Sequence, residues 1–308
     1  MSIGAEAWLP STYHEIPLED GDRLAVLDSI PQEWSARHPS VLLVHGLGGS
    51  ARSSYVKRIA VRLWKIGIRV VRMNLRGAGA GFGLARGIYH AGRTEDLRAV
   101  LDWMGRSGGG SPIGLLGFSL GGNLVLKLAA EASETALEGL DCVVAVNPPI
   151  DLKACCEWIR RPENRIYDQN FVKLLKTQID RLHQRFPELG PVNLTDVGTL
   201  YDFDDRYTAL RNRFSGADEY YAASSAQPLI PRIAVDGLVI HSENDPFIPV
   251  DPFQVTAFPE SVKLELVPGG GHLGYLSRGS WNGSRRWLDL RVTTWFSQRW
   301  RYTPRGHQ

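Results

Sequence analysis

Two serines of this sequence stand in the pattern Gly-x-Ser-x-Gly, which is typical of a nucleophilic serine at a sharp turn between a strand and a helix. Ser119 follows the apolar run Ile113–Leu116 and precedes the helical pattern Leu120–Glu131, so we expect its hydroxyl at the carboxyl edge of a sheet. Ser107 lies where a helical pattern ends and a run of glycines begins, which predicts a helix end and a turn. We therefore predict Ser119 as the nucleophile. The alternative is a tight turn without chemistry.

A serine hydroxyl needs a neighbouring imidazole to accept its proton. The chain has eight histidines, and the position of one fits this role. His272 follows the strand-like run Val262–Val267 and a glycine-rich loop, past the last predicted strand. In the chain order serine, acid, histidine, the base belongs at this place. The other histidines lie in terminal or linking segments, in or near strands and loops, or in a helical pattern: His14, His38, His45, His90, His183, His241 and His307.

The acid that orients the imidazole is expected after the strand-like run Gly237–Ile240, between serine and histidine in the chain. Two carboxylates follow this run, Glu243 and Asp245. Asp245 is the better candidate because Pro246 fixes the turn directly behind it. Asp205 remains as a second option for the acid.

The tetrahedral intermediate of acyl transfer needs two backbone N–H donors for its oxyanion. One is expected from Leu120, the residue after the nucleophile, and the other from Leu47 in the glycine-rich stretch after the strand-like run Val41–Val44. His45 begins the same stretch and is a second candidate base. Its position at a strand end favours a structural role.

A cluster of carboxylates at Asp202, Asp204 and Asp205 raises the question of a metal site. No histidine or further carboxylate has a matching spacing, so we interpret the cluster as solvated or as holding a cap segment in place. We predict neither a metal nor a cofactor.

The candidate residues follow short apolar runs, and these runs alternate along the chain with amphipathic helical patterns. This alternation favours a mostly parallel sheet with helices on both faces. The predicted strands are Val41–Val44, Ile68–Met73, Ile113–Gly117, Cys142–Val146, Gly237–Ile240 and Val262–Val267. The predicted helices are Ser54–Lys65, Thr94–Met104, Leu120–Glu131 and Arg285–Trp300.

The alternation stops between about residues 151 and 230, where helical stretches such as Asn170–Arg185 and aromatic-rich turns replace the strands. We expect this segment to be a helical cap inserted into a core of residues 1–150 and 231–308. The alternative is a long excursion that merely covers the sheet.

The bulk composition excludes several classes of protein. With 35 basic and 33 acidic side chains the charges nearly cancel, and no basic stripe suggests nucleic acid. No apolar run approaches the roughly 18 residues of a membrane span. The first residues lack the features of a secretory signal, and the three cysteines are too few for a disulfide framework. We therefore expect a cytoplasmic protein, and its oligomeric state is left open.

Five motifs together resemble the YheT-like branch of the α/β-hydrolases, to which plant embryogenesis-associated proteins also belong. They are HGLGGS at 45–50, NLRGAG at 74–79, GFSLGGN at 117–123, ENDPFIP at 243–249 and GGGHLG at 269–274. The FDD segment at 203–205 and the stretch RRWLDLRVTTW at 285–295 resemble more specific features of that branch, its cap and its last helix.

The resemblance implies the α/β-hydrolase fold and hydrolysis of a small-molecule carboxylic ester, often with a medium-chain or lipid-like acyl group, and sometimes acyl transfer to an alcohol. It assigns the triad to Ser119, Asp245 and His272. An acyltransferase or thioesterase would use the same triad, because exclusion of water by the cap decides which nucleophile accepts the acyl group. A dehalogenase or epoxide hydrolase would need an aspartate at the position of Ser119. A non-catalytic binding module would be indicated by the loss of a triad residue, and all three are present.

Overall fold

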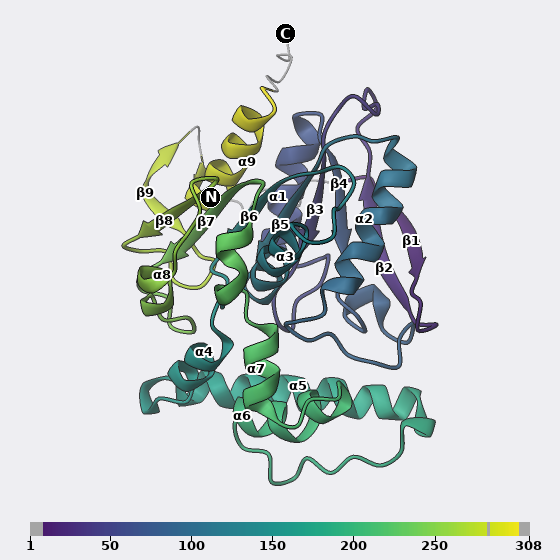
Figure 1. Cartoon of the computed structure of the whole chain (residues 1–308), viewed down its shortest axis with the longest axis vertical. Coiled ribbons are helices and arrows are strands. Elements are labelled where there is room, and N and C mark those ends of the chain that lie inside the picture. Colours follow the sequence, from purple (N-terminus) through teal and green to yellow (C-terminus); the bar gives the residue numbers. More distant parts are fainter. Residues whose placement is uncertain (1–8, 282–283, 302–308) are drawn as a thin grey trace.

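An eight-stranded sheet forms the centre of the computed structural model, which describes residues 9–281 and 284–301 (Figure 1). Its strands are β1 (Thr12–Pro17), β2 (Arg23–Ser29), β3 (Ser40–Val44), β4 (Arg69–Met73), β5 (Ile113–Phe118), β6 (Leu140–Val146), β7 (Asp236–Ser242) and β8 (Val262–Val267). The spatial order is β1-β2-β4-β3-β5-β6-β7-β8. Strand β2 is antiparallel to both of its neighbours, and the strands from β4 to β8 are parallel. Their carboxyl ends therefore meet at one edge of the sheet.

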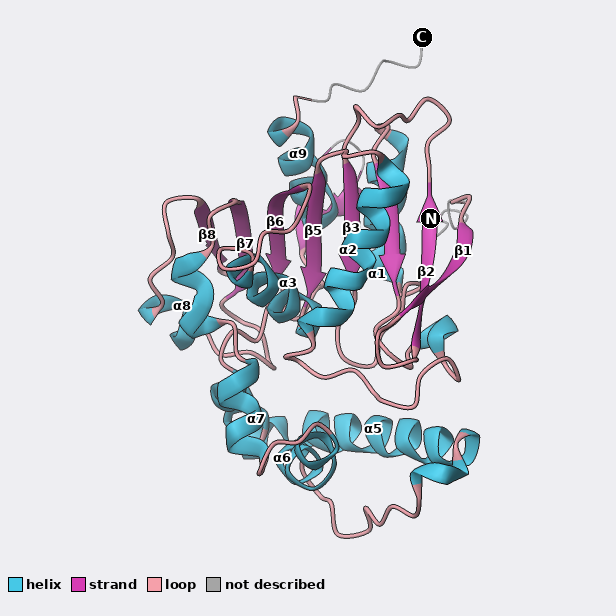
Figure 2. Ribbon diagram, turned by 45° about the vertical axis from the view of Figure 1, so that its right-hand side comes forward, coloured by secondary structure: helices cyan, strands magenta, loops and turns pink. Residues whose placement is uncertain are grey.

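Helices cover both faces of this sheet (Figure 2). On one face of the sheet, Ile59 and Val292 from two different helices pack into a buried cluster with side chains of the strands. On the opposite face, Leu101 and Leu126 from two other helices pack into a second buried cluster. Strand β3 is buried along its whole length because both of its faces are covered. The helices of the core are α1 (Ser54–Lys65), α2 (Thr94–Gly108), α3 (Leu120–Glu131), α8 (Asp251–Val255) and α9 (Trp287–Arg299), with a 3₁₀ turn η1 (Gly79–Gly81).

Between β6 and β7 the chain forms only helices and turns. Residues 147–235, all within the described part of the chain, contain no strand. Helices α5, α6 and α7 lie beyond the carboxyl ends of the strands (Figures 1 and 2). The elements of this segment are α4 (Leu152–Ile159), η2 (Pro162–Asn164), α5 (Arg165–Arg185), η3 (Pro187–Leu189), α6 (Leu200–Phe203), the π-helix η4 (Asp204–Ala209), α7 (Ala217–Ser224) and η5 (Gln227–Arg232).

The predicted fold class is confirmed, and each predicted strand and helix has a counterpart in the structure. The helix expected from Arg285 begins two residues later, because Ser284–Arg286 forms the short strand β10 against β9 (Leu276–Trp281). These two strands were not predicted from the sequence, and neither were β1 and β2. None of the described helices combines the length and the apolar character needed to cross a lipid bilayer.

Candidate active site

The turn at Ser119 joins β5 to α3 in a strained conformation. Ser119 has φ 51° and ψ −123°, a region that side-chain-bearing residues rarely adopt and that typically costs about 1–3 kcal/mol. The backbone N–H of Ser119 donates to Val146 O at 2.9 Å, which holds the turn against β6. A Cβ at Gly117 would lie only 2.1 Å from Gly121 O, so both glycines of the pattern allow strand and helix to pass this closely. The strain exposes the hydroxyl at the carboxyl edge of the sheet.

His272 reaches this hydroxyl from the loop after β8. Its Nε2 lies 3.1 Å from Ser119 Oγ, and its Nδ1 lies 2.7 Å from Asp245 Oδ2. A carboxylate can only accept, so Nδ1 carries the hydrogen in this pair and Nε2 is left to accept from the serine hydroxyl. The structure thus brings the three residues predicted from the sequence into one hydrogen-bonded chain.

The loops that carry Asp245 and His272 are hydrogen-bonded to each other. Asn244 Oδ1 accepts from the N–H groups of Gly270 and Gly271 at 3.1 and 2.9 Å, directly before His272. Asp245 is buried, and its Oδ1 accepts from the N–H of Phe247 at 2.8 Å. These bonds fix the carboxylate and the imidazole loop in one arrangement.

Asn147 is a further residue of the site, and the sequence analysis did not single it out. It follows β6 in a left-handed conformation with φ 45°. Its Nδ2 donates to Asp245 Oδ2 and to Gly271 O, and its Oδ1 accepts from the hydroxyl of Tyr275. The available signal was its position: an asparagine directly after a buried parallel strand, at the edge where the other site residues lie.

The loop after β3 packs against Ser119. A Cβ at Gly46 would lie 2.9 Å from Ser119 Cβ, so only glycine permits this approach. The N–H of Gly46 donates to Tyr55 Oη at 3.1 Å, and that of Gly48 donates to Tyr89 Oη at 2.9 Å. Within the described residues, the N–H of Leu47 between them has no protein acceptor. The two tyrosines hold the loop from both sides and leave this donor beside Ser119.

His45 is occupied by backbone groups. Its Nδ1 lies 2.8 Å from Gly46 O, its Nε2 accepts from the N–H of Leu75 at 3.0 Å, and burial lowers its pKa to about 4. With both ring nitrogens engaged, His45 orders the loop and has no free nitrogen for a proton from Ser119. Among the histidines in the described ranges, only His272 contacts the Ser119 hydroxyl, and His307 lies outside those ranges.

The second serine in the Gly-x-Ser-x-Gly pattern, Ser107, lies in the last turn of α2. Its hydroxyl donates to Met104 O at 3.2 Å and accepts from the guanidinium of Arg69 at 2.8 Å. Gly109 then ends the helix in the left-handed conformation, as expected for a helix terminus.

The carboxylates at 202–205 have three separate partners. Asp202 and Thr199 form a capping box at the start of α6, and Asp205 Oδ1 accepts from the N–H of Ala217 at 2.9 Å. Asp204 is buried and accepts from the hydroxyl of Tyr221 at 2.8 Å. The carboxylates therefore tie segments of the insertion together. No set of three potential metal-ligating side chains gathers within residues 9–281 and 284–301.

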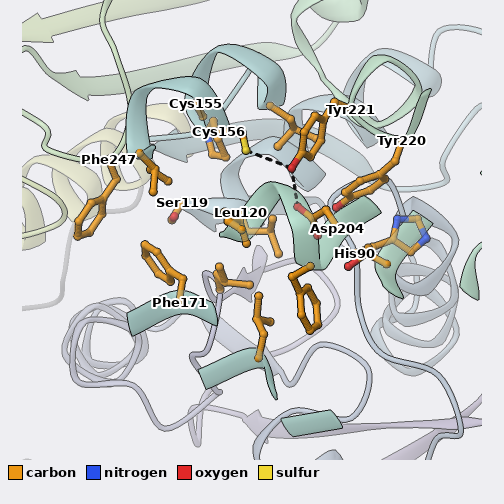
Figure 3. Close-up of a pocket in the computed structure, with 18 of the residues that line it drawn as sticks. His90, Ser119, Leu120, Cys155, Cys156, Phe171, Asp204, Tyr220, Tyr221 and Phe247 are labelled. Carbon is orange, nitrogen blue, oxygen red and sulfur yellow. Dashed lines mark hydrogen bonds between the residues drawn. The ribbon is translucent and has the colours of Figure 1, made fainter. Parts of the chain in front are cut away.

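An apolar pocket leads from Ser119 and His272 into the insertion (Figure 3). Phe171 on α5 and Phe247 from the loop after β7 lie at the end that contains Ser119, with ring centroids 5.4 Å apart. Leu47 and Leu120 line the wall beside the serine. The pocket is thus formed jointly by the sheet edge and the helices of residues 152–232.

Sequence comparison agrees with this architecture. The model of the Alpha/beta hydrolase family matches residues 41–302. YheT of Escherichia coli, named as a candidate esterase, is 32% identical over 292 residues, which are 92% of this chain and 84% of YheT.

Two further likenesses are more distant. A monoacylglycerol lipase of Saccharomyces cerevisiae is 26% identical, over 81% of this chain and only 57% of the lipase. The solved structure of esterase Pf2001 from Pyrococcus furiosus shares the fold with a TM-score of 0.59, 18% identity and coverage of 95% of this chain and 93% of that one. The chain therefore belongs to the α/β hydrolase family, in its YheT-like branch, as a carboxylic ester hydrolase.

Proposed function

We propose that this enzyme cleaves esters of medium-length or lipid-like acyl groups through an acyl-enzyme on Ser119, with His272 as base and Asp245 as orienting acid. The observation that carries the proposal is the continuous chain Ser119 Oγ, His272 Nε2, His272 Nδ1 and Asp245 Oδ2, with separations of 3.1 and 2.7 Å at its two hydrogen bonds. Such a chain lets the imidazole accept the serine proton while the carboxylate stabilises the resulting imidazolium.

In the acylation step, Ser119 Oγ attacks the ester carbonyl as its proton moves to His272 Nε2. The negative charge then develops on the carbonyl oxygen, where the N–H groups of Leu47 and Leu120 are proposed to donate to it. A single donor of this kind is worth about 2.7–4 kcal/mol in the transition state. Collapse of the intermediate breaks the bond to the alcohol oxygen, which takes the proton from His272 and leaves.

In the deacylation step, water takes the place of the alcohol. His272 Nε2 accepts a proton from the water as its oxygen attacks the acyl carbon. The second tetrahedral intermediate uses the same two donors, and its collapse returns the proton to Ser119 Oγ. The sum of the steps is one ester and one water converted into one acid and one alcohol, without a cofactor.

Residues 151–230 are proposed as a cap on a core of residues 1–150 and 231–308. Phe171 and Leu175 of α5 line the pocket that opens at Ser119, and the ring of Phe247 lies 4.7 Å from that of His272. A cap in this position would cover the acyl chain and limit access of water. Each buried methylene contributes about 0.8 kcal/mol, so two more carbons raise kcat/KM roughly tenfold until the pocket is full.

A second hollow shares Ser119 and His272 with the first and contains polar side chains, among them Ser53, Ser54 and Arg58. We assign the alcohol part of the ester to this hollow and the acyl chain to the apolar pocket. The apolar pocket suits a chain that stays bound through the acyl-enzyme, and the polar hollow suits an alcohol that leaves.

A panel of p-nitrophenyl esters from acetate to palmitate tests the proposal. We expect esters of about six to ten carbons to react fastest by kcat/KM. Ser119→Ala should lose on the order of 10⁴–10⁶ in turnover, whereas Ser107→Ala keeps the wild-type rate. Acetate or propionate as the fastest substrate, with a steady decline for longer chains, would contradict the acyl-chain assignment and leave the triad standing.

The site of action is proposed to be a reducing compartment, the cytoplasm. Cys142, Cys155 and Cys156 are buried free thiols, and free thiols persist where glutathione and thioredoxin keep them reduced. Expression with and without export to an oxidising compartment, followed by thiol counting on the folded enzyme, tests this assignment. The assignment to the cytoplasm predicts three free thiols in the enzyme made in the reducing compartment and fewer in the exported enzyme.

A further inference from the structure

The far end of the apolar pocket is polar, although the wall beside Ser119 is not. Figure 3 shows Asp204, Tyr220, Tyr221 and His90 gathered at the end of the pocket away from Ser119. All four side chains are buried. A pocket that only accommodated an alkyl chain would end on apolar side chains, because a methyl group cannot replace water at a polar group.

Asp204 supplies an acceptor at this end. It begins the π-helix η4, a rare helix type that often occurs at functional sites. Its Oδ2 accepts from the hydroxyl of Tyr221 at 2.8 Å, and the hydroxyl of Thr208 is a second hydrogen-bond partner. No ion pair to Asp204 is present among the described residues. Burial raises the pKa of this carboxyl to about 6, since its hydrogen bonds compensate only part of the lost hydration. At pH 7 to 8 the pocket therefore ends on a buried carboxylate without a cation.

His90 does not supply the missing cation. Burial lowers its pKa to about 3, with a further contribution from the charge of Arg93. Its Nδ1 accepts from the N–H of Gly92 at 3.2 Å. The imidazole at this end of the pocket is thus neutral.

Tyr220 supplies a donor. Its hydroxyl oxygen accepts from the N–H of Ala91 at 3.0 Å, and its own hydrogen has no acceptor within the described residues. A buried hydroxyl usually donates as well as accepts. The pocket end therefore combines an acceptor that has no cation beside it, Asp204, with a donor whose hydrogen has no acceptor, Tyr220.

We propose that this end is a binding subsite for a hydroxyl group carried at the far end of the acyl chain. A hydroxyl donates to Asp204 and accepts from Tyr220 at the same time. A methyl group would do neither, and an ammonium group would pair with Asp204 but could not accept from Tyr220. The inference rests on the proposed function in taking the apolar pocket as the acyl side, and it narrows the substrate class to esters of ω-hydroxy acids.

The competing explanation is structural. The bond between Asp204 and Tyr221 joins η4 to α7 and would serve to hold the insertion together without any ligand. That explanation predicts no difference between a plain and a hydroxylated acyl chain.

The test compares p-nitrophenyl esters of hexanoic to dodecanoic acid with their ω-hydroxy counterparts. In the wild-type enzyme, plain esters should slow down at the length that reaches Asp204, and at that length the hydroxylated ester should be about tenfold or more faster by kcat/KM. The ratio for two esters on one sample does not depend on the fraction of folded protein. In Asp204→Asn we expect this ratio to fall toward one.

Asp205→Asn is the matched control, because the same change is made at the next residue, whose carboxyl binds Ala217 N–H and is not among the pocket-lining residues. It should keep the wild-type ratio. A wild-type ratio of one or less at every length, or an unchanged ratio in Asp204→Asn, overturns the subsite.

Binding of the free acids to the Ser119→Ala protein separates the subsite from the reaction. Calorimetry should give about tenfold tighter binding of the ω-hydroxy acid than of the plain acid of the same length. Equal binding overturns the subsite even if esters are cleaved. A binding preference in an enzyme that cleaves none of the esters would retain the subsite and refute the proposed function.

Discussion

Asn147 donates a hydrogen bond to the same carboxylate oxygen of Asp245 that faces His272. The oxygen that orients the imidazole is therefore itself held from a neighbouring strand end. Because Asn147 is also bonded to Tyr275 and to Gly271 O, it links the end of β6 with the loops that carry Asp245 and His272.

Removal of this link should lower turnover without affecting substrate binding. Asn147→Ala is expected to reduce kcat about 10- to 100-fold, the equivalent of one hydrogen bond to a charged group, with KM nearly unchanged. Steady-state kinetics on protein of verified fold measure both constants. An increase in KM at constant kcat would mean that Asn147 contacts substrate and does not position Asp245.

The identity of the acid can be tested by comparing kcat for two Asp→Asn variants. Asp245→Asn should lose roughly 10⁴ in kcat, because the amide favours the wrong tautomer of His272. Asp205→Asn should stay close to wild type, since its carboxyl binds the backbone of Ala217. A larger loss of kcat in Asp205→Asn than in Asp245→Asn would identify Asp205 as the acid.

The loop before α1 should tolerate no side chain next to the nucleophile. A Cβ at Gly46 would lie 2.9 Å from Ser119 Cβ and 3.2 Å from Phe118 O, so Gly46→Ala must displace Leu47 from the serine. We expect a loss of about 10²–10³ in kcat, the effect of one lost oxyanion donor. Gly105→Ala is the control, because a Cβ there has no neighbour within 4 Å and alanine favours its helix. Comparable losses in both variants would refute the close-approach argument.

The sequence specified the parallel part of the fold well because buried parallel strands are continuous apolar runs, as in β3 and β5. Ser119, Asp245 and His272 could be predicted to lie at one edge of the sheet because each follows a recognisable strand, and the structure joins them by hydrogen bonds. The hairpin of β1 and β2 was not predicted, although Asp20 and Gly21 lie in the short connection between the two strands and β2 contains the apolar stretch LAVL.

Asn147 and the pocket end could not be predicted in the same way. Asn147 acts through contacts with residues that are 98 and 128 positions away, and Tyr220 meets Ala91 across 129 positions. Local patterns do not encode such pairings. The cluster at 202–205 was visible in the sequence, but only the fold distinguishes Asp204, which lines the pocket, from Asp202 and Asp205, which cap and tie the insertion.

The ionised side chain of Asp204 should lower the free energy of unfolding at neutral and alkaline pH. Its pKa in the folded protein, about 6, lies above the ordinary value of 3.8, so the folded state binds this proton more tightly than the unfolded chain does. The contribution of Asp204 to stability is therefore highest in acid, falls as the pH rises from about 4 to about 6, and stays low above that. Asp204→Asn should raise Tm by a few degrees at pH 8 and by less at pH 5.

Scanning fluorimetry at the two pH values measures this difference. Asp205→Asn, at a carboxyl bonded to backbone, should show no such gain. A lower Tm for Asp204→Asn at both pH values would indicate that hydrogen bonds within the free enzyme fully stabilise the Asp204 carboxylate. That result would contradict the inference that this carboxylate can accept a further hydrogen bond from a ligand.

The central claim is that Ser119 is the activated nucleophile, and covalent labelling tests it most directly. A fluorophosphonate reacts with a serine hydroxyl that a neighbouring imidazole activates, and peptide mass spectrometry identifies the modified residue. We predict a single phosphonylated peptide that contains Ser119, no label on Ser107, and no label at all in Ser119→Ala. Labelling that persists in Ser119→Ala, or that maps to Ser107, would contradict the account.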